Sequence, residues 1–156
     1  MRDRTVIGVI GGRRAEKHLL KEAEEVGRLI AGKGAVMVCG GMKGVMEAAS
    51  RGARAAGGLT VGILPQEHSR EANQYIDVAV PTGLGIARNV IIARTADALI
   101  AVGGEYGTLS EIAFALQMRK PVVGIGTWEI RGVIPAEGAS DAVERAFEEL
   151  AARTEE

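Results

Sequence analysis

The feature that most constrains the fold is the alternation of short apolar runs with amphipathic segments. Apolar runs that read as buried strands occupy residues 5–12, 35–41, 59–65, 97–104 and 121–126, and residues 74–83 are weakly strand-like. Segments with helical spacing of apolar residues occupy 15–34, 43–58, 84–96, 108–120 and 139–156. Strands that are apolar on both faces and alternate with helices are typical of βαβ units. We therefore predict one Rossmann-like, doubly wound α/β domain over residues 1–156, with a mainly parallel sheet and helices on both faces.

Composition and charge exclude several classes of function. The chain has 19 basic and 20 acidic residues and no basic block, so we expect no nucleic acid partner. No run approaches the ~18 apolar residues of a membrane helix, so we expect no membrane partner. The apolar part of the N-terminal stretch is short and charges follow it, which favours a buried strand over a secretory leader.

The cysteine and histidine content points to the cytoplasm and against a metal site. Cys39 is the single cysteine, which makes an intrachain disulfide impossible and fits a reducing compartment. Of the two histidines, we interpret His18 as solvated, and His68 as either a surface residue or part of the rim of a ligand site. We expect no metal and no resident cofactor.

Glycines gather where the apolar runs end. In open α/β sheets, ligands bind beyond the carboxyl ends of the strands, near the point where the strand order reverses. Gly11 and Gly12 end the first run, and they form either a nucleotide contact or a plain tight turn. Arg13 and Arg14 come next, and we interpret them as solvated or as lying at the rim of a ligand.

The second cluster, CGGMKG at 39–44, lies between a strand and a helix. Successive N–H groups at such a helix start bind anions, and the helix dipole favours this. The pattern is not a Walker A loop, because the required Lys-Ser/Thr is missing. Gly40, Gly41 and Gly44 therefore form either an anion site or a packing turn.

The third cluster, GGEYGTLSE at 103–111, is the strongest local signal. Gly103, Gly104 and Gly107 allow the main chain to approach a phosphate. Thr108 either contacts that phosphate or caps the next helix, and in the second case Glu111 completes a capping box without any chemistry. Arg88 lies on the preceding helix, and the helix, strand and loop bring it to the same end of the sheet as Glu111.

These motifs resemble those of the Lonely Guy family, also labelled "lysine decarboxylase-like". The family signature reads Pro-Gly-Gly-x-Gly-Thr-x-x-Glu, preceded by an Arg-Lys pair and a Gly-Gly-Gly-x-x-Gly-Leu-Met turn. The corresponding stretches here are GGEYGTLSE, ARN and CGGMKGVM. The similarity runs over residues 5–126. It is strongest to a small bacterial subfamily and to molybdenum cofactor carrier proteins of algae and cyanobacteria.

The resemblance implies a function. Enzymes of the family cleave the N-glycosidic bond of nucleoside 5′-monophosphates and release the base and ribose 5-phosphate. By this resemblance, Arg88 and Glu111 match the catalytic pair, and Gly104, Gly107 and Thr108 match the phosphate loop. A carboxylate near the ribose would stabilise an oxocarbenium-like transition state. Nothing in the sequence supports lysine decarboxylation.

Four positions depart from the signature. Gly103 replaces the proline, Glu105 the second glycine, Asn89 the lysine and Ser110 the first glutamate. These departures keep a second hypothesis open, a non-catalytic carrier or sensor of a phosphorylated cofactor or nucleotide. The resemblance also implies a homodimer or higher homo-oligomer, and the apolar surface of segment 84–96 supports this expectation.

Overall fold

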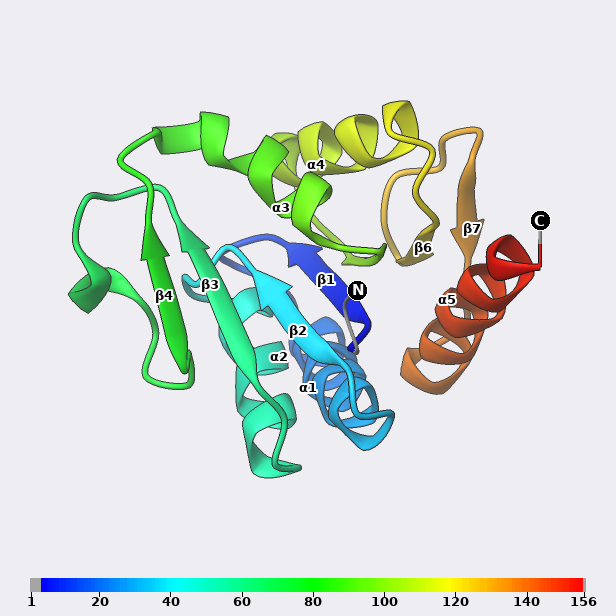
Figure 1. Cartoon of the computed structure of the whole chain (residues 1–156), viewed down its shortest axis with the longest axis horizontal. Coiled ribbons are helices and arrows are strands. Elements are labelled where there is room, and N and C mark those ends of the chain that lie inside the picture. Colours follow the sequence, from blue (N-terminus) through cyan, green and yellow to red (C-terminus); the bar gives the residue numbers. More distant parts are fainter. Residues whose placement is uncertain (1–3, 156) are drawn as a thin grey trace.

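The computed structural model describes residues 4–155 and shows a parallel sheet of seven strands in the order β4-β3-β2-β1-β5-β6-β7 (Figure 1). The strands are β1 (Val6–Gly11), β2 (Val36–Cys39), β3 (Thr60–Leu64), β4 (Val78–Pro81), β5 (Ala98–Val102), β6 (Val122–Ile125) and β7 (Val133–Pro135). Every pair of neighbouring strands runs parallel. The predicted Rossmann-like α/β fold is confirmed.

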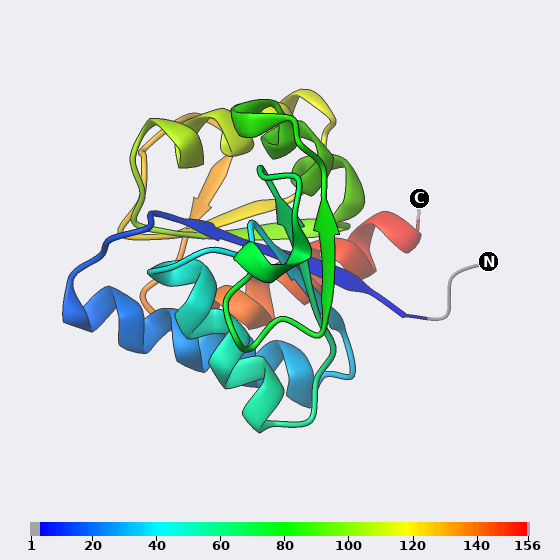
Figure 2. The ribbon, with the colours of Figure 1, turned by 90° about the vertical axis from the view of Figure 1, so that its left-hand side faces the viewer.

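Helices cover both faces of this sheet. They are α1 (Lys17–Gly32), α2 (Val45–Ala55), α3 (Asn89–Thr95), α4 (Tyr106–Gln117) and α5 (Ala139–Thr154). In Figure 2 the sheet is seen on edge, with α1 and α2 below it and α3 and α4 above it. Two short 3₁₀ turns, Ser69–Glu71 and Gly85–Arg88, complete the list of helical elements in the described residues.

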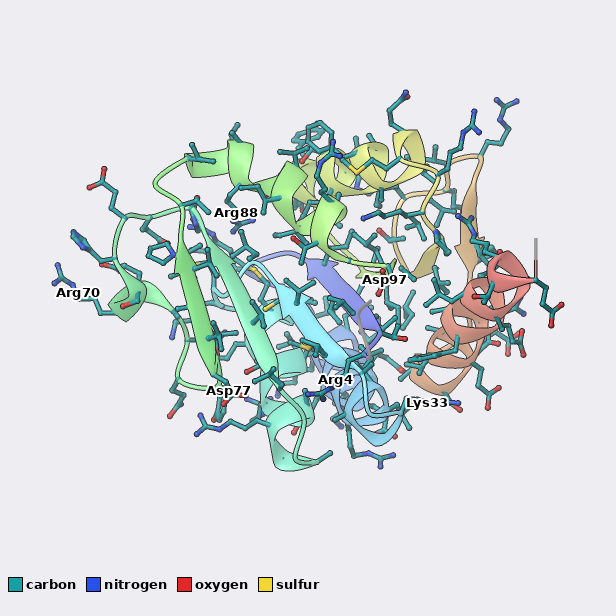
Figure 3. All side chains as sticks on the ribbon, in the orientation of Figure 1. Arg4, Lys33, Arg70, Asp77, Arg88 and Asp97 are labelled. Carbon is teal, nitrogen blue, oxygen red and sulfur yellow. The ribbon has the colours of Figure 1, made fainter. Side chains whose placement is uncertain are left out.

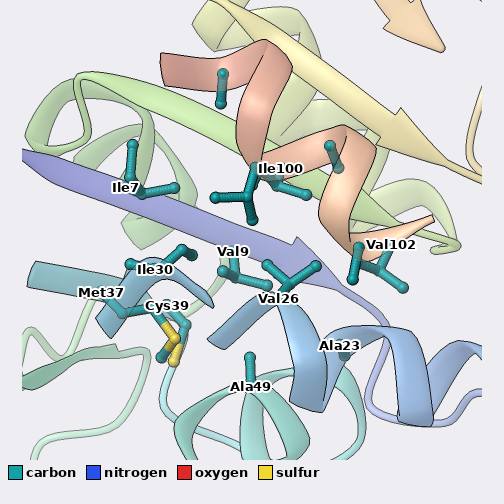
Figure 4. Packing of buried hydrophobic residues seen from close by; sticks show 14 of the residues in the cluster. Ile7, Val9, Ala23, Val26, Ile30, Met37, Cys39, Ala49, Ile100 and Val102 are labelled. Atoms are coloured by element: carbon teal, nitrogen blue, oxygen red, sulfur yellow. The ribbon is translucent and has the colours of Figure 1, made fainter. Parts of the chain in front are cut away.

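The core forms two layers, one on each face of the sheet. Successive residues of β1 enter opposite layers, because side chains alternate along a strand. Ile7 and Val9 pack with α1, α2 and α5 (Figure 4), whereas Val6 and Ile10 pack with α3 and α4. Both layers exclude water, which explains why the strands read as unbroken apolar runs.

The strand order reverses between β1 and β5. These two strands are neighbours, with Gly11 opposite Val102 in the register. The chain leaves β1 toward α1 on one face and leaves β5 toward α4 on the other face (Figures 1 and 2). Because the two connections diverge, their first residues border an open crevice at the carboxyl ends of the strands.

The structure differs from the sequence expectations in three places. Segment 84–96 is a 3₁₀ turn followed by the short helix α3, instead of one helix. Helix α4 begins at Tyr106, two residues before the expected start, with Glu105 at the N-cap. β7 was not predicted, because three residues are too few for a periodic signal. Residues 1–3 of the predicted domain and residue 156 of the predicted last helix lie outside the described residues.

Among residues 4–155, no helix is long and apolar enough to cross a membrane.

Candidate functional site

A pocket of about 450 Å³ occupies the crevice between the connections that follow β1 and β5. A pocket of this size accommodates a small organic ligand. Six of the predicted site residues line it, namely Gly11, Gly12, Arg88, Gly107, Thr108 and Glu111. The other lining residues are Arg13, Arg14, Met46, Pro65, Gly85, Ile86, Asn89 and Glu105.

The other predicted glycines, Gly40, Gly41, Gly44, Gly103 and Gly104, are absent from the lining, and contacts beside the pocket explain three of them. A Cβ on Gly40 would lie 2.7 Å from Nη2 of Arg88. Gly44 has φ +66°, and a Cβ there would lie 2.3 Å from the carbonyl oxygen of Gly12. Gly104 has φ +108° and packs directly against Thr108. These glycines allow the pocket-lining residues to take their positions.

Arg88 is a buried cation with incomplete hydrogen bonding. Its side chain is held above the upper ends of the strands (Figure 3), and the residue is 7% exposed. Nη1 donates to Oδ1 of Asn89, and Nη2 donates to the carbonyl oxygen of Gly40 at 3.4 Å. Nε is buried and has no partner among the described residues. Burial lowers the pKa of Arg88, although nearby Glu111 opposes this shift.

Glu111 lies in the second turn of α4 and is 6% exposed. Burial raises the pKa of its carboxyl group to about 8, and the positive charge of Arg88 opposes the shift without reversing it. Among the described residues, no ion pair within 4.0 Å joins the two side chains. The capping-box interpretation of Glu111 is wrong, because α4 begins before Thr108 and Thr108 is therefore not the N-cap.

Two of the positions that depart from the family signature contact each other. Nδ2 of Asn89 donates to Oγ of Ser110 at 3.1 Å, and Oγ of Ser110 donates to the carbonyl oxygen of Gly107 at 2.6 Å. Because Asn89 also accepts from Arg88, this chain of hydrogen bonds connects the buried guanidinium to the first turn of α4.

Glu105, a third departure, lies at the pocket with an exposed side chain. Its carbonyl oxygen accepts a hydrogen bond from Nε1 of Trp128 at 3.2 Å, and the ring of Trp128 lies 6.0 Å from that of Tyr106. Trp128 therefore packs beside the start of α4 and is not part of the pocket lining.

Sequence reasoning did not assign Met46, Pro65, Gly85 and Ile86 to the site. Met46, in α2, belongs to the buried core and also lines the pocket. Pro65 and Ile86 follow β3 and β4, and a strand order was needed to place those connections near Arg88. For Arg13 and Arg14, the signal in the sequence was a basic pair directly after the glycines that follow the first apolar run.

Histidine, cysteine and carboxylate side chains do not gather into a metal site. Within residues 4–155, no group of three or more such residues is placed to hold a metal ion. Cys39 is buried and unpaired, and burial raises the pKa of its thiol. A buried thiol with a raised pKa is a poor nucleophile.

Fold and pocket together define a Rossmann-like α/β protein with a cationic pocket at the topological switch point. The chain belongs to the SLOG cluster4 family, whose model matches residues 4–151. This confirms the relationship that the sequence motifs indicated.

Two relatives and two solved structures are similar to this chain. A protein of Archaeoglobus fulgidus is 49% identical over 76% of this chain and 78% of its own length. A Mycobacterium tuberculosis protein named cytokinin riboside 5′-monophosphate phosphoribohydrolase is 34% identical over 70% of this chain and 64% of its own length.

The two solved structures match this chain over almost its whole length. The molybdenum cofactor binding protein of Rippkaea orientalis is 37% identical with a TM-score of 0.91, and the match covers 96% of this chain and 99% of that one. The molybdenum cofactor carrier protein of Chlamydomonas reinhardtii is 35% identical with a TM-score of 0.85, over 95% and 99% of the two chains.

Proposed function

We propose that this protein binds a nucleotide or another phosphorylated small molecule in the pocket at the switch point, and that it acts as a carrier or sensor of that ligand in the cytoplasm. One observation carries the proposal. The buried guanidinium of Arg88 has an unpartnered Nε beside the N-terminus of α4. The first N–H groups of a helix have no partner within the helix, and together with the helix dipole they favour an anion.

The state of Glu111 supports the same proposal. A carboxyl group with a pKa of about 8 is mostly protonated at neutral pH. It therefore places little negative charge beside Arg88, and it offers an O–H donor to a bound oxyanion. The exposed carboxylate of Glu105 is the remaining acidic group of the lining.

The names of similar proteins suggest which ligands to test. The solved structures are named for the molybdenum cofactor, and the mycobacterial relative is named for a nucleoside 5′-monophosphate. Calorimetry and thermal shift with nucleoside monophosphates, ribose 5-phosphate and molybdopterin-type ligands will identify binders.

Arg88→Gln tests the residue that carries the proposal. We expect it to weaken binding about tenfold or more, because it removes a charge-assisted hydrogen bond. Arg94→Gln, which changes an exposed arginine outside the pocket, is the matched control. Equal affinity of the Arg88 variant and the unmodified protein would contradict the proposal, as would the absence of any binder.

A second candidate function is hydrolysis of the N-glycosidic bond of a nucleoside 5′-monophosphate. The observation in its favour is a buried carboxyl group with a raised pKa next to an arginine in the same pocket, an arrangement typical of acid–base catalysis. Here Arg88 would hold the substrate, and Glu111 in its ionised form would stabilise the ribosyl cation.

Chromatography for free base in each binding mixture separates the two functions. If the protein is a hydrolase, we expect Glu111→Gln to abolish base release and to leave ligand affinity within about threefold, because the amide preserves the shape of the side chain. Unchanged turnover in this variant would rule out the role of Glu111. Tight binding without base release from any nucleotide supports the carrier.

A further inference from the structure

Two arginines on the β1–α1 connection are not used by the function proposed above. Arg13 and Arg14 line the same pocket as Arg88, and both are exposed. Neither forms a hydrogen bond or an ion pair with another described residue. Many other arginines of the protein have such partners, among them Arg28 with Glu25 and Arg51 with Glu24.

The topology places these arginines on a different wall from the start of α4. After β1 the chain turns down toward α1, whereas after β5 it rises toward α4 on the other face of the sheet (Figure 2). Arg13 and Arg14 therefore belong to the α1 side of the pocket, and Gly107 and Thr108 belong to the α4 side. The positive charge of Arg13 nevertheless contributes to lowering the pKa of Arg88, so the two walls are close enough to interact electrostatically.

The backbone fixes where the β1–α1 connection begins. The carbonyl oxygen of Gly12 accepts a hydrogen bond from the amide N–H of Val45 at 3.1 Å. Gly44 packs against the backbone of Gly12 and Arg13, since a Cβ there would lie 2.4 Å from the carbonyl carbon of Arg13. The segment that presents the arginines is thus held against the start of α2.

The two walls of the pocket differ in their acidic residues. On the α4 side, the lining contains the carboxylate of Glu105 and the carboxyl group of Glu111, which is largely protonated at neutral pH. On the α1 side, the lining contains no acidic residue beside Arg13 and Arg14. A cavity of about 450 Å³ also exceeds what a single inorganic anion fills.

We propose that the ligand of this pocket carries two separate anionic groups, one held by Arg88 and the first turn of α4, and the other held by Arg13 and Arg14 across the pocket. This inference rests on the proposed binding of a phosphorylated molecule and specifies its class. The preferred ligand is a bis-anionic compound with charged groups at two ends of an organic skeleton, in preference to a phosphate monoester with one charged end.

The test compares two ligands that differ by one phosphate, adenosine 5′-monophosphate and adenosine 3′,5′-bisphosphate. Calorimetry gives the dissociation constant of each for the unmodified protein and for Arg13→Gln/Arg14→Gln. We expect the bisphosphate to bind at least tenfold more tightly to the unmodified protein. In the double variant we expect this ratio to fall to about threefold or less, with the affinity for the monophosphate little changed.

The control variant removes two exposed arginines outside the pocket, Arg70→Gln/Arg131→Gln. Arg70 extends outward from the edge of the molecule beside β4, away from Arg88 (Figure 3). This variant should keep the preference for the bisphosphate, because the overall loss of charge is the same but the pocket is intact.

Two of the three outcomes separate the two proposals. Equal affinity for the two nucleotides overturns the bis-anionic ligand and leaves the proposed binding of a phosphorylated molecule in place. A preference that survives in Arg13→Gln/Arg14→Gln overturns the assignment of these arginines. Absence of binding by both nucleotides at millimolar concentration overturns this inference together with nucleotide binding.

Discussion

At the scale of single residues, the pocket is governed by how burial changes charge. Arg88 and Glu111 are both buried, yet no ion pair within 4.0 Å joins them. Burial disfavours the charged form of each group, and a carboxyl group yields to it more readily than a guanidinium does. Consequently Glu111 becomes a neutral acid while Arg88 stays a cation, and the pocket gains affinity for an anion.

The raised pKa of Glu111 predicts a pH dependence of stability. Between pH 4.5, the ordinary pKa of glutamate, and about pH 8, the folded protein keeps a proton that the unfolded chain loses. The free energy of unfolding should therefore fall as pH rises through this window, by up to about 1.4 kcal/mol per pH unit from this group. In Glu111→Gln this contribution should disappear.

Urea unfolding at pH 5, 6, 7 and 8 measures this effect. Glu105→Gln, which changes an exposed carboxylate of the same pocket, is the control and should retain the slope of the unmodified protein. If the curves of Glu111→Gln and the unmodified protein run parallel, the carboxyl group of Glu111 is ionised in the folded state.

Asn89 is the residue that connects Arg88 to α4. Asn89→Ala removes the acceptor for Nη1 of Arg88 and the donor to Ser110, so we expect a loss of roughly 1–2 kcal/mol in stability and weaker ligand binding. Ser110→Ala leaves the acceptor of Arg88 in place and should affect binding less. Thermal melts and calorimetry compare the two, and equal losses of binding would show that Asn89 does not position Arg88.

At the scale of elements, the β2–α2 turn packs against Arg88, which lines the pocket. The turn that follows β2 brings Gly40 against the guanidinium of Arg88, at a distance that leaves no room for a Cβ. Packing at Gly40 and positive φ at Gly41 and Gly44 account for the glycines of this turn, and the anion site that the sequence also allowed there stays a prediction.

Gly40→Ala should therefore weaken ligand binding more than it destabilises the fold. The added methyl group would displace the flexible ends of Arg88 and Met46, which can shift without moving the backbone. Gly32→Ala, at the end of α1, is the control, because a Cβ there meets nothing within 4 Å. Calorimetry measures the ligand affinity of each variant, and thermal melts measure its stability. Unchanged affinity in Gly40→Ala would show that ligand binding does not depend on the orientation of Arg88.

At the scale of the whole molecule, large apolar side chains remain exposed along one edge. Val78 and Val80 lie on the edge strand β4, and Leu84 and Ile86, which follow it, are 52% and 89% exposed. Exposed edge strands and apolar surface of this kind favour association.

We accordingly expect light scattering to give a multiple of the 16.3 kDa chain mass. Leu84→Asp should reduce the assembly, because it places a charge in the apolar surface while leaving the pocket lining unchanged. Glu148→Gln, on the exposed face of α5, serves as the control. A mass of one chain for the unmodified protein at high concentration would contradict the expectation.

The sequence by itself determined the layered α/β fold, because runs buried on two faces and amphipathic helices leave distinct periodic patterns. It also determined that Arg88, Thr108 and Glu111 meet at one end of the sheet, since parallel strands deliver their following loops to the same edge. These inferences depend on spacing along the chain.

Only the tertiary structure decided which of the glycines border open space. Gly12 and Gly107 line the pocket, whereas Gly40 and Gly44 pack behind it, and all four follow strands in the sequence. The tertiary structure also decided that Arg13 and Arg14 face the same pocket as Arg88, and that Glu111 is buried. The burial of a side chain, its charge state and the wall of the pocket on which it lies all depend on residues from distant parts of the chain. Local spacing in the sequence therefore cannot predict them.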